Sequence, residues 1–274
     1  MDQKKTVVFQ SHHSLHQDWL IRCTQSVRHW CVLQGFDYQW LGDELFEINP
    51  AWFNEKVKGR GPILSDLARL KHSARFLENY ERVIWLDADV FLFNPHSFSI
   101  TQSSYLMGRE CWVQPHKKGL KFGWKVYRSL CNAFLMFERD NPILPYYIHA
   151  CEQTIKRVDP QWIAPQMIGP KFLTALNSVS PLHYTDQIGS ASPHLIRDLA
   201  HITQFSSSQT PALDQMIDFF SQNTEQCHGL NLCASLVGTQ AYDLSYIDED
   251  VLHHAMDALE EKSNRLFSSL ATHH

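Results

Sequence analysis

The stretch VIWLDADVFLFNP, residues 83–95, decides the fold that we predict for this chain. Its apolar start belongs to a run, RVIWL at 82–86, that leads directly into Asp87, Ala88 and Asp89. A short run that is apolar on both faces is typical of a strand buried inside a parallel sheet. We therefore expect a strand over 82–86 with two carboxylates at its carboxyl end.

Strand and helix patterns alternate on the amino-terminal side of that stretch. We expect strands at 5–10 and 36–42, helices at 16–34 and from Pro62 onward, and a loop over 43–61. Such alternation predicts a mostly parallel central sheet with helices on both faces. Ligands of these folds bind beyond the carboxyl ends of the strands, which is where the two aspartates are expected.

The pattern is weaker after residue 100. We expect a strand at 131–138, a helix at 141–158 and a loop-rich segment at 178–212, which is rich in Ser, Pro and His. A final amphipathic helix is expected at 248–271, where Asp248 can cap the first turn. Its apolar face comprises Leu252, Ala255, Met256, Leu259, Leu266 and Leu270.

These elements predict an α/β fold in two parts, a domain over 1–247 and a C-terminal helical segment over 248–274. The apolar face of that segment must pack on the domain, on a partner chain or on a membrane. Acidic residues outnumber basic ones on its polar face, which disfavours a membrane surface. We expect it to pack within the chain or against a protein partner.

The composition suits one globular domain. The chain has 274 residues, 44% of them hydrophobic, and a net charge of −5, so a core can form and nucleic acid is not an expected partner. Seven cysteines without a CxxC motif argue against a disulfide framework or a structural zinc. No apolar stretch reaches about 18 residues and no signal-peptide run opens the chain, so we expect a cytoplasmic protein without a transmembrane segment.

The strongest chemical signal is the pair Asp87 and Asp89. Residues two apart in an extended segment point the same way, so the two carboxylates face one point in space. Like charges so close repel unless a cation lies between them, and Mg²⁺ or Mn²⁺ binds carboxylate and phosphate oxygens. The alternative is an acidic pair exposed in a turn. The apolar runs on both sides favour a metal site, because burying carboxylates without compensation costs several kcal/mol.

Three more polar residues are candidates for a site. Asp66 and Arg69 are three apart on the helix expected from Pro62, so they share one helix face. The residues alone leave open whether they form a local surface ion pair or part of a binding site. Asn132 begins the strand expected at 131–138, where a turn or capping role is the alternative.

Four motifs follow one another along the chain: SDLARL (65–70), VIWLDADVFLFNP (83–95), NAFLMFERDNPIL (132–144) and IGPKFLT (168–174). In this order they resemble the family of glycosyltransferases with a DXD sugar-binding region, the mannosyl-, galactosyl- and capsule-type transferases of family 32. The resemblance covers roughly residues 5–176. It implies a GT-A type nucleotide-sugar-binding fold and a metal-dependent hexosyltransferase that retains the anomeric configuration.

The resemblance also implies roles for single residues. Asp87 and Asp89 would hold Mn²⁺ or Mg²⁺ and, together with Ala88, line the site of the nucleotide-sugar donor. Asp66 and Arg69 would contact the sugar and the phosphate of that donor.

Further implied roles concern catalysis and the acceptor. Asn132 would lie near the donor sugar and take part in catalysis with Asp66 and Arg69. The segment that begins at Gly169 would shape the site of a glycan, lipid-linked or protein acceptor. The family has a late histidine ligand to the metal, for which His228 is the candidate; an ordinary loop histidine is the alternative.

Two other functions are compatible with the pattern. A phosphatase that forms an aspartyl-phosphate would use Asp87 as nucleophile and Asp89 as acid/base, and would need a later lysine and a second acidic pair such as Asp248 and Asp250. A non-catalytic binder of nucleotide-sugars on the same fold is the second alternative.

Overall fold

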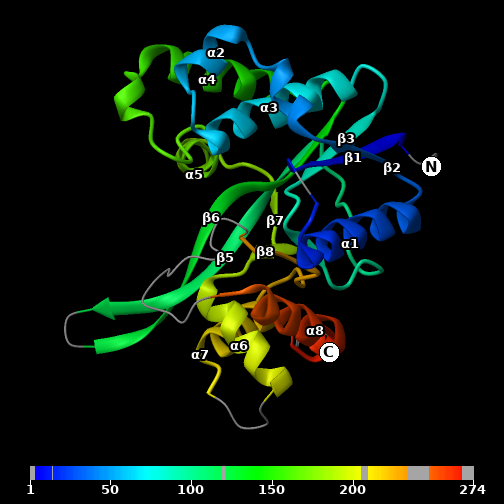
Figure 1. Cartoon of the computed structure of the whole chain (residues 1–274), viewed down its shortest axis with the longest axis vertical. Helices are drawn as coiled ribbons and strands as arrows, with labels where there is room; N and C mark the ends of the chain where they lie inside the picture. The colour runs from blue at the N-terminus through cyan, green and yellow to red at the C-terminus, as the bar shows by residue number, and fades with distance from the viewer. Residues whose placement is uncertain (1–3, 14, 119–120, 205–208, 234–246, 267–274) are drawn as a thin grey trace.

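The computed structural model describes residues 4–13, 15–118, 121–204, 209–233 and 247–266. Its centre is a six-stranded sheet in the order β2-β1-β3-β6-β5-β7 (Figure 1). β6 is antiparallel to both of its neighbours, and all other pairings in this sheet are parallel. The strands are β1 (Thr6–Ser11), β2 (Asp37–Leu41), β3 (Arg82–Leu86), β5 (Tyr105–Lys118), β6 (Lys121–Glu138) and β7 (Tyr184–Thr185).

Helices cover both faces of this sheet. α1 (Asp18–Gln34) packs on one face, in a core that it shares with Ile84 of β3. α3 (Gly61–Phe76), α4 (Ile143–Arg157) and α5 (Pro170–Val179) pack on the other face, in a core that contains Trp85. The predicted fold class is therefore confirmed: an α/β domain with a mostly parallel central sheet between helices, as expected of a GT-A type fold.

Local sequence explains where the elements near the site begin and end. α1 ends at Gly35, whose φ of 65° lies in the left-handed region that glycine adopts without a steric penalty. α3 begins with Gly61 and Pro62, and proline is favoured in a first helical turn because its missing N–H needs no partner there. β3 covers the same residues, 82–86, that the apolar run predicts.

The segment expected as a loop at 43–61 contains two short helices. They are the 3-10 helix η1 (Asp43–Ile48) and α2 (Ala51–Lys56). The expectation of a loop was wrong because Pro50 precedes a helix instead of interrupting one. Phe53 of α2 is fully buried in the same core as the apolar side chains of α3, and this contact holds α2 in place.

The segment expected to be loop-rich at 178–212 also contains a helix, α6 (Pro193–Gln204). Its proline stands at the first position, and the buried residues Leu195, Ile196 and Leu199 follow at helical spacing. The abundance of Ser, Pro and His in this segment concealed that apolar pattern.

A second, three-stranded sheet continues from the end of β3. Its order is β4-β9-β8, formed by β4 (Val90–Leu92), β9 (Gly229–Asn231) and β8 (Ile188–Ser190). β9 is antiparallel to β4, and Val90 pairs with Asn231. A strand from near residue 230 thereby lies directly beside the segment that follows Asp89.

α6, α7 (Pro211–Ser221) and α8 (Glu249–Leu266) form a third core at the lower end of the molecule in Figure 1. Asp248 caps α8, since its Oδ1 accepts a hydrogen bond of 2.9 Å from the backbone N–H of Val251. Leu252, Met256 and Leu259 are fully buried against α6 and α1.

Parts of the expected final helix lie outside the described residues. This applies to the side chain of Leu266 and to the whole of Leu270. The division of the chain at 247/248 stays a prediction. Within the described ranges, no helix combines the length and the apolar character needed to cross a bilayer. The remaining short element is η2 (Pro160–Trp162).

Candidate active site

The candidate site lies where the order of the strands reverses. The chain passes from β1 through α1 to β2 on one side, and then through α3 to β3 on the other side of β1. Connections that leave adjacent parallel strands in opposite directions open a crevice at the carboxyl ends of those strands. The crevice here is a pocket of about 420 Å³. Its lining comes from the end of β1 (Ser11, His12), the start of α3 (Gly61, Pro62, Ser65, Arg69) and the end of β3 (Trp85, Asp87, Ala88, Asp89).

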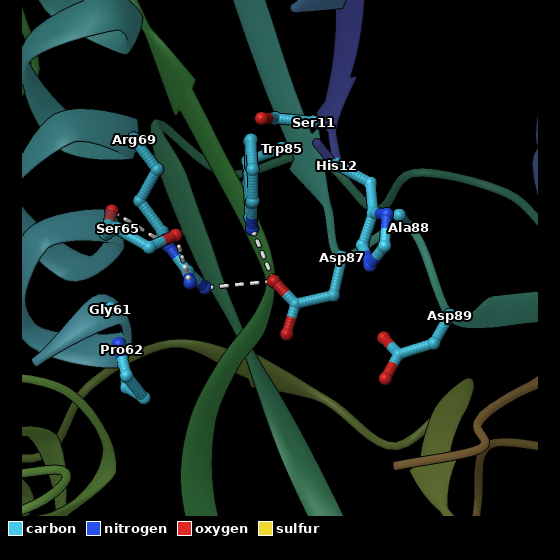
Figure 2. A pocket seen from close by; sticks show the side chains of 10 residues that line it. All are labelled: Ser11, His12, Gly61, Pro62, Ser65, Arg69, Trp85, Asp87, Ala88 and Asp89. Atoms are coloured by element: carbon cyan, nitrogen blue, oxygen red, sulfur yellow. Dashed lines mark hydrogen bonds and ion pairs between the residues drawn. The ribbon is translucent and has the colours of Figure 1, made fainter. Parts of the chain in front are cut away.

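Asp87 is held in place from two elements. Its Oδ1 accepts hydrogen bonds of 2.8 Å from Arg69 Nη1 and of 2.8 Å from Trp85 Nε1 (Figure 2). The Arg69 guanidinium carbon also lies 4.7 Å from the centre of the Trp85 ring, a cation–π contact. The second carboxylate oxygen, Oδ2, points away from Trp85 (Figure 2), and the side chain of Asp87 is 27% exposed.

Arg69 joins Asp87 to a buried cluster behind the pocket. Nη1 also donates to the backbone O of Asn132 at 2.8 Å, while Nε and Nη2 donate to the backbone O and the Oγ of Ser65. Nη2 lies 3.6 Å from Oδ1 of Asp66. The same Oδ1 accepts a hydrogen bond of 2.7 Å from Asn132 Nδ2. We call Asp66, Arg69 and Asn132 the inner cluster.

Burial determines the electrostatics of the inner cluster. Asp66 is only 4% exposed, and desolvation raises the pKa of its carboxyl group from 3.8 to about 6, although Arg69 and Asn132 act in the opposite direction. Arg69 and Asn132 are each 6% exposed. The interpretation of Asp66 and Arg69 as a surface ion pair is therefore wrong. A turn or capping role for Asn132 is wrong as well, since it lies within β6 and its amide binds Asp66.

Gly169 closes the inner cluster from α5. A Cβ atom at this position would lie 2.6 Å from Asp66 Oδ2 and 2.9 Å from Asn132 Nδ2. No side chain fits there, because real Cβ atoms do not approach other atoms so closely. The IGP segment therefore packs directly on the Asp66–Asn132 pair.

Asn231 links the two aspartates. Its Nδ2 lies 3.1 Å from Asp89 Oδ1 and 3.4 Å from Asp87 Oδ2. Its Oδ1 accepts a hydrogen bond of 2.7 Å from the backbone N–H of Cys233, which fixes the orientation of the amide. The backbone N–H of Leu232 also donates to the carbonyl of Asp89 at 2.9 Å. We call Asp87 and Asp89 the outer pair; a donor N–H group already points between its carboxylates.

His228 does not join the outer pair, which corrects its expected role as the late metal ligand. It precedes β9, and its backbone O accepts a hydrogen bond from the N–H of Asn94, beyond the far end of β4. Desolvation lowers the pKa of its imidazole. Across the described parts of the chain, no three His, Cys, Asp or Glu side chains gather as a metal-ligand group. The segment of His228 does reach the site, but through Asn231.

The donor set of the outer pair fits a hard divalent cation. Mg²⁺ and Mn²⁺ prefer oxygen ligands, and Mg²⁺ is commonly held by one or two carboxylates together with substrate phosphates. Asp87 Oδ2 and the Asp89 carboxylate supply such oxygens at the rim of the pocket. Arg69, which also lies near Asp66, offsets only part of the negative charge, so the outer pair keeps a net negative charge that a divalent cation would neutralise.

Sequence patterns did not reveal Asn231 or Glu110 as members of this region, whereas Ser65 stands in the SDLARL motif. Burial raises the pKa of Glu110, on β5, to about 7. Burial chiefly, and then the charges of Asp89 and Glu110, raise the pKa of the Cys233 thiol. The pairing of β9 with β4 brings Asn231 to the end of β3, and the pairing of β5 with β6 carries Glu110.

Comparisons with known proteins show a distant likeness to solved structures. No family model matches this chain, and no curated protein matches it. Among solved structures, it is similar to the crystal structure of a glycosyltransferase involved in the glycosylation of the major capsid of PBCV-1. That match has a TM-score of 0.47 and 11% identity, and covers 92% of this chain and 99% of the other. At this distance the likeness by itself assigns neither an activity nor a substrate.

Proposed function

We propose that this chain is a metal-dependent glycosyltransferase that moves a hexosyl group from a nucleotide-sugar to an acceptor hydroxyl. The observation that carries the proposal is the outer pair, Asp87 and Asp89, at the carboxyl end of β3, on the rim of a pocket at the strand-order reversal. Such a pocket, with few but converging polar groups, is the usual form of a small-molecule site.

The pocket suits the diphosphate of a nucleotide-sugar. α3 begins at Gly61 without a side-chain cap, so the N–H groups of its first turn are left for an anionic ligand. Nothing lies within 4 Å of the position of a Cβ on Gly61, which leaves room for a phosphate near the backbone. Ser65 and Arg69 follow on the same helix and also line the pocket.

Mn²⁺ or Mg²⁺ would be held by Asp87 and Asp89 and would supply neutralisation of the charge that develops on the leaving nucleoside diphosphate. The protein's own residues position the pair: Arg69 and Trp85 hold Oδ1 of Asp87, while Asn231 holds Asp89. The resemblance implies that Asp66 and Asn132 would contact the donor sugar; both are buried and hydrogen-bonded to each other next to Gly169.

We further propose that the transfer retains the anomeric configuration. This part rests on the resemblance of the four sequence motifs to a retaining family. NMR of the first-formed product from a donor of defined configuration tests it, and a product of inverted configuration would overturn it.

The aspartyl-phosphate alternative is less well supported by the geometry. Asp87, its nucleophile, is bound by Arg69 and Trp85 through one oxygen. No lysine is among the residues that line the pocket, as far as the chain is described. Asp248 caps α8, so this member of the second acidic pair has a structural role away from the pocket.

The test is calorimetry of nucleoside diphosphates and nucleotide-sugars, with and without Mn²⁺, on the wild-type chain and on Asp87→Asn and Asp89→Asn. We expect at least one nucleotide to bind only with Mn²⁺ and both variants to lose that binding. Asp218→Asn, an exposed carboxylate on α7, is the matched control. Unchanged affinity in both variants would refute the proposal. Release of phosphate from simple phosphate esters would favour the phosphatase instead.

A further inference from the structure

The hairpin of β5 and β6 extends beyond the edge of the central sheet at which the outer pair lies. The backbone N–H of Asp87 donates to the carbonyl of Ala133, so β6 residues before 133 continue past the end of β3. They pair with β5 from Gly108 onward, after an irregularity next to Met107. Figure 1 shows the resulting two-stranded ribbon projecting from the body of the molecule. We call this part the arm.

One face of the arm is anchored. Cys111 and Val113 are buried in the core of α6, α7 and α8. Trp124 packs against that core and meets His194 of α6 edge to face, with ring centres 5.0 Å apart. The Arg128 guanidinium lies over the Phe219 ring of α7 at 4.7 Å. These contacts fix the orientation of the arm relative to the pocket.

The other face carries a row of aromatic and polar side chains. Cross-strand partners share a face, and the pairs here are Glu110 with Ser129, Trp112 with Tyr127, and Gln114 with Lys125. Contacts along the row connect them. Trp112 Nε1 donates to Gln114 Oε1 at 2.9 Å, and Lys125 Nζ lies 4.7 Å from the centre of the Tyr127 ring.

Neither Trp112 nor Tyr127 belongs to a hydrophobic core cluster of the described structure, although both are large aromatic residues. Each is only partly buried. Aromatic side chains that carry a polar tip and lie outside the core are typical of binding surfaces. The row begins at Glu110, two residues along β5 from Gly108, which pairs with Cys131 of β6. Cys131 lies two residues before Ala133, whose carbonyl binds the backbone of Asp87, so the row starts near the outer pair and leads away from it.

We propose that this row is the binding surface for a saccharide acceptor, which lies along the arm with its reactive hydroxyl at the Glu110 end. Rings of Trp112 and Tyr127 offer flat apolar faces to the C–H groups of sugar rings, and Gln114 and Lys125 offer hydrogen bonds to hydroxyl groups. From residue 110 to residue 116 a strand spans roughly 20 Å, which suits an oligosaccharide. The role as acceptor site rests on the proposed function.

Charge narrows the class of saccharide. No Asp or Glu occurs between residues 111 and 137, whereas the chain as a whole has a net charge of −5. Lys125 is exposed on the row itself. Glu110 is the carboxylate at the inner end of the row, so it is the part around Lys125 that attracts anionic groups of a ligand. Among oligosaccharides of equal length, those with carboxylate or phosphate groups should therefore bind more tightly than neutral ones.

The test measures binding of the full chain to a panel of defined oligosaccharides, neutral and uronic-acid-containing, and to vesicles with and without phosphatidylserine. The variants are Trp112→Ala, Tyr127→Ala and the double variant Gln114→Ala with Lys125→Ala, which changes only partly or fully exposed polar groups. Trp162→Ala is the matched control, because Trp162 is 69% exposed on η2. Mn²⁺-dependent nucleotide binding is measured on every variant.

We expect at least one oligosaccharide to bind, with affinity reduced about tenfold by each aromatic substitution and unchanged in the control. Nucleotide binding should stay intact in all of them. The proposal is overturned if no oligosaccharide binds, or if the substitutions in the row leave oligosaccharide binding unchanged. It is also overturned if the row binds anionic vesicles and no oligosaccharide. If the wild-type chain binds saccharides through the row but binds no nucleotide with Mn²⁺, the proposed function is refuted instead.

Discussion

The inner cluster and the outer pair contain carboxylates that meet at one arginine, yet their surroundings differ. Asp66 is 4% exposed and has a pKa raised to about 6 by desolvation. The side chain of Asp87 is 27% exposed and faces the pocket. Arg69 lies between them, 3.6 Å from Asp66 and 2.8 Å from Asp87.

The difference separates two tasks. A buried, hydrogen-bonded cluster fixes side-chain positions, whereas groups on a pocket rim can exchange protein and water partners for a ligand. If this division is correct, substitutions in the inner cluster change stability before any ligand is added. Substitutions in the outer pair change what a ligand adds to stability.

The largest effect is expected for Arg69→Leu. The substitution removes the donor to Asp87, Asn132 and Ser65 and leaves Asp66 buried without its cation. Breaking a buried pair in this way costs about 3–5 kcal/mol. Urea denaturation should show that loss, and Mn²⁺-dependent nucleotide binding should disappear with it.

Arg75→Leu is the control, since Arg75 is exposed on the same helix and a change there is expected to stay within about 0.5 kcal/mol. An Arg69→Leu chain as stable as wild type would show that the inner cluster does not support the site. The sequence-based view of an exposed ion pair would predict only about 0–1 kcal/mol.

Asp66→Asn should change how stability depends on pH. The folded-state pKa of Asp66, about 6, lies above its ordinary value of 3.8, so the folded chain binds this proton more tightly than the unfolded chain. The stability that this tighter proton binding contributes to the folded chain is therefore fully present below about pH 4 and is lost as the pH rises through about 6. The variant should lack this fall and gain up to roughly 3 kcal/mol over wild type at pH 7.

Stability measured from pH 4 to 8 checks this, with Glu55→Gln, an exposed carboxylate on α2, as control. A variant that keeps the wild-type pH profile would mean that Asp66 is not desolvated in the folded state. Destabilisation at every pH would mean that the Asp66 charge is needed to hold Arg69.

The two groups also differ in how far the sequence predicts them. Asp87 and Asp89 follow an apolar run that forms β3 over the expected residues, because a buried central strand has a strong local signature. The burial of Asp66 has no local signature. It arises because Asn132 on β6, 66 residues away in the sequence, donates a buried hydrogen bond to Asp66 on α3.

Pairing over long sequence distances explains the remaining misses. Asn231 reaches Asp89 across 142 residues through the β4–β9 pairing, and no motif marks it. The resemblance therefore implied His228, a histidine of the same segment, as the late metal ligand. α6 was missed for a different reason, since polar residues and Pro193 outweighed a correct apolar spacing.

Gly169→Ala tests the inner cluster from its α5 side. The added Cβ would lie 2.6 Å from Asp66 Oδ2 and 2.9 Å from Asn132 Nδ2, and both groups are held by other bonds. Overpacking of this kind costs about 1–3 kcal/mol. Thermal unfolding measures it, and Gly61→Ala, with nothing within 4 Å of its Cβ position, should be neutral. Equal melting of the two variants would place Gly169 away from the cluster.

The smallest change in stability is expected for Asp89→Asn, the outer member that does not touch Arg69 in the described contacts. Asn231 Nδ2 donates to its Oδ1 at 3.1 Å, and an asparagine oxygen accepts the same bond. The substitution also removes one of two neighbouring negative charges, which offsets part of any lost contact. Without ligand, stability should stay within about 1 kcal/mol of wild type.

Asp89→Asn should differ from wild type in how much a ligand raises its stability. At 100 times its Kd, a nucleotide bound with Mn²⁺ stabilises the wild-type chain by about 2.7 kcal/mol, and the variant should lose that gain. The inner-cluster variants show the reverse order, with stability changed before any ligand is added. An Asp89→Asn chain that melts as early as Arg69→Leu, or that keeps the full Mn²⁺-dependent gain, would contradict the division. Asp89 would then belong to the scaffold, and the cation would have to be held by Asp87 and the phosphates without it.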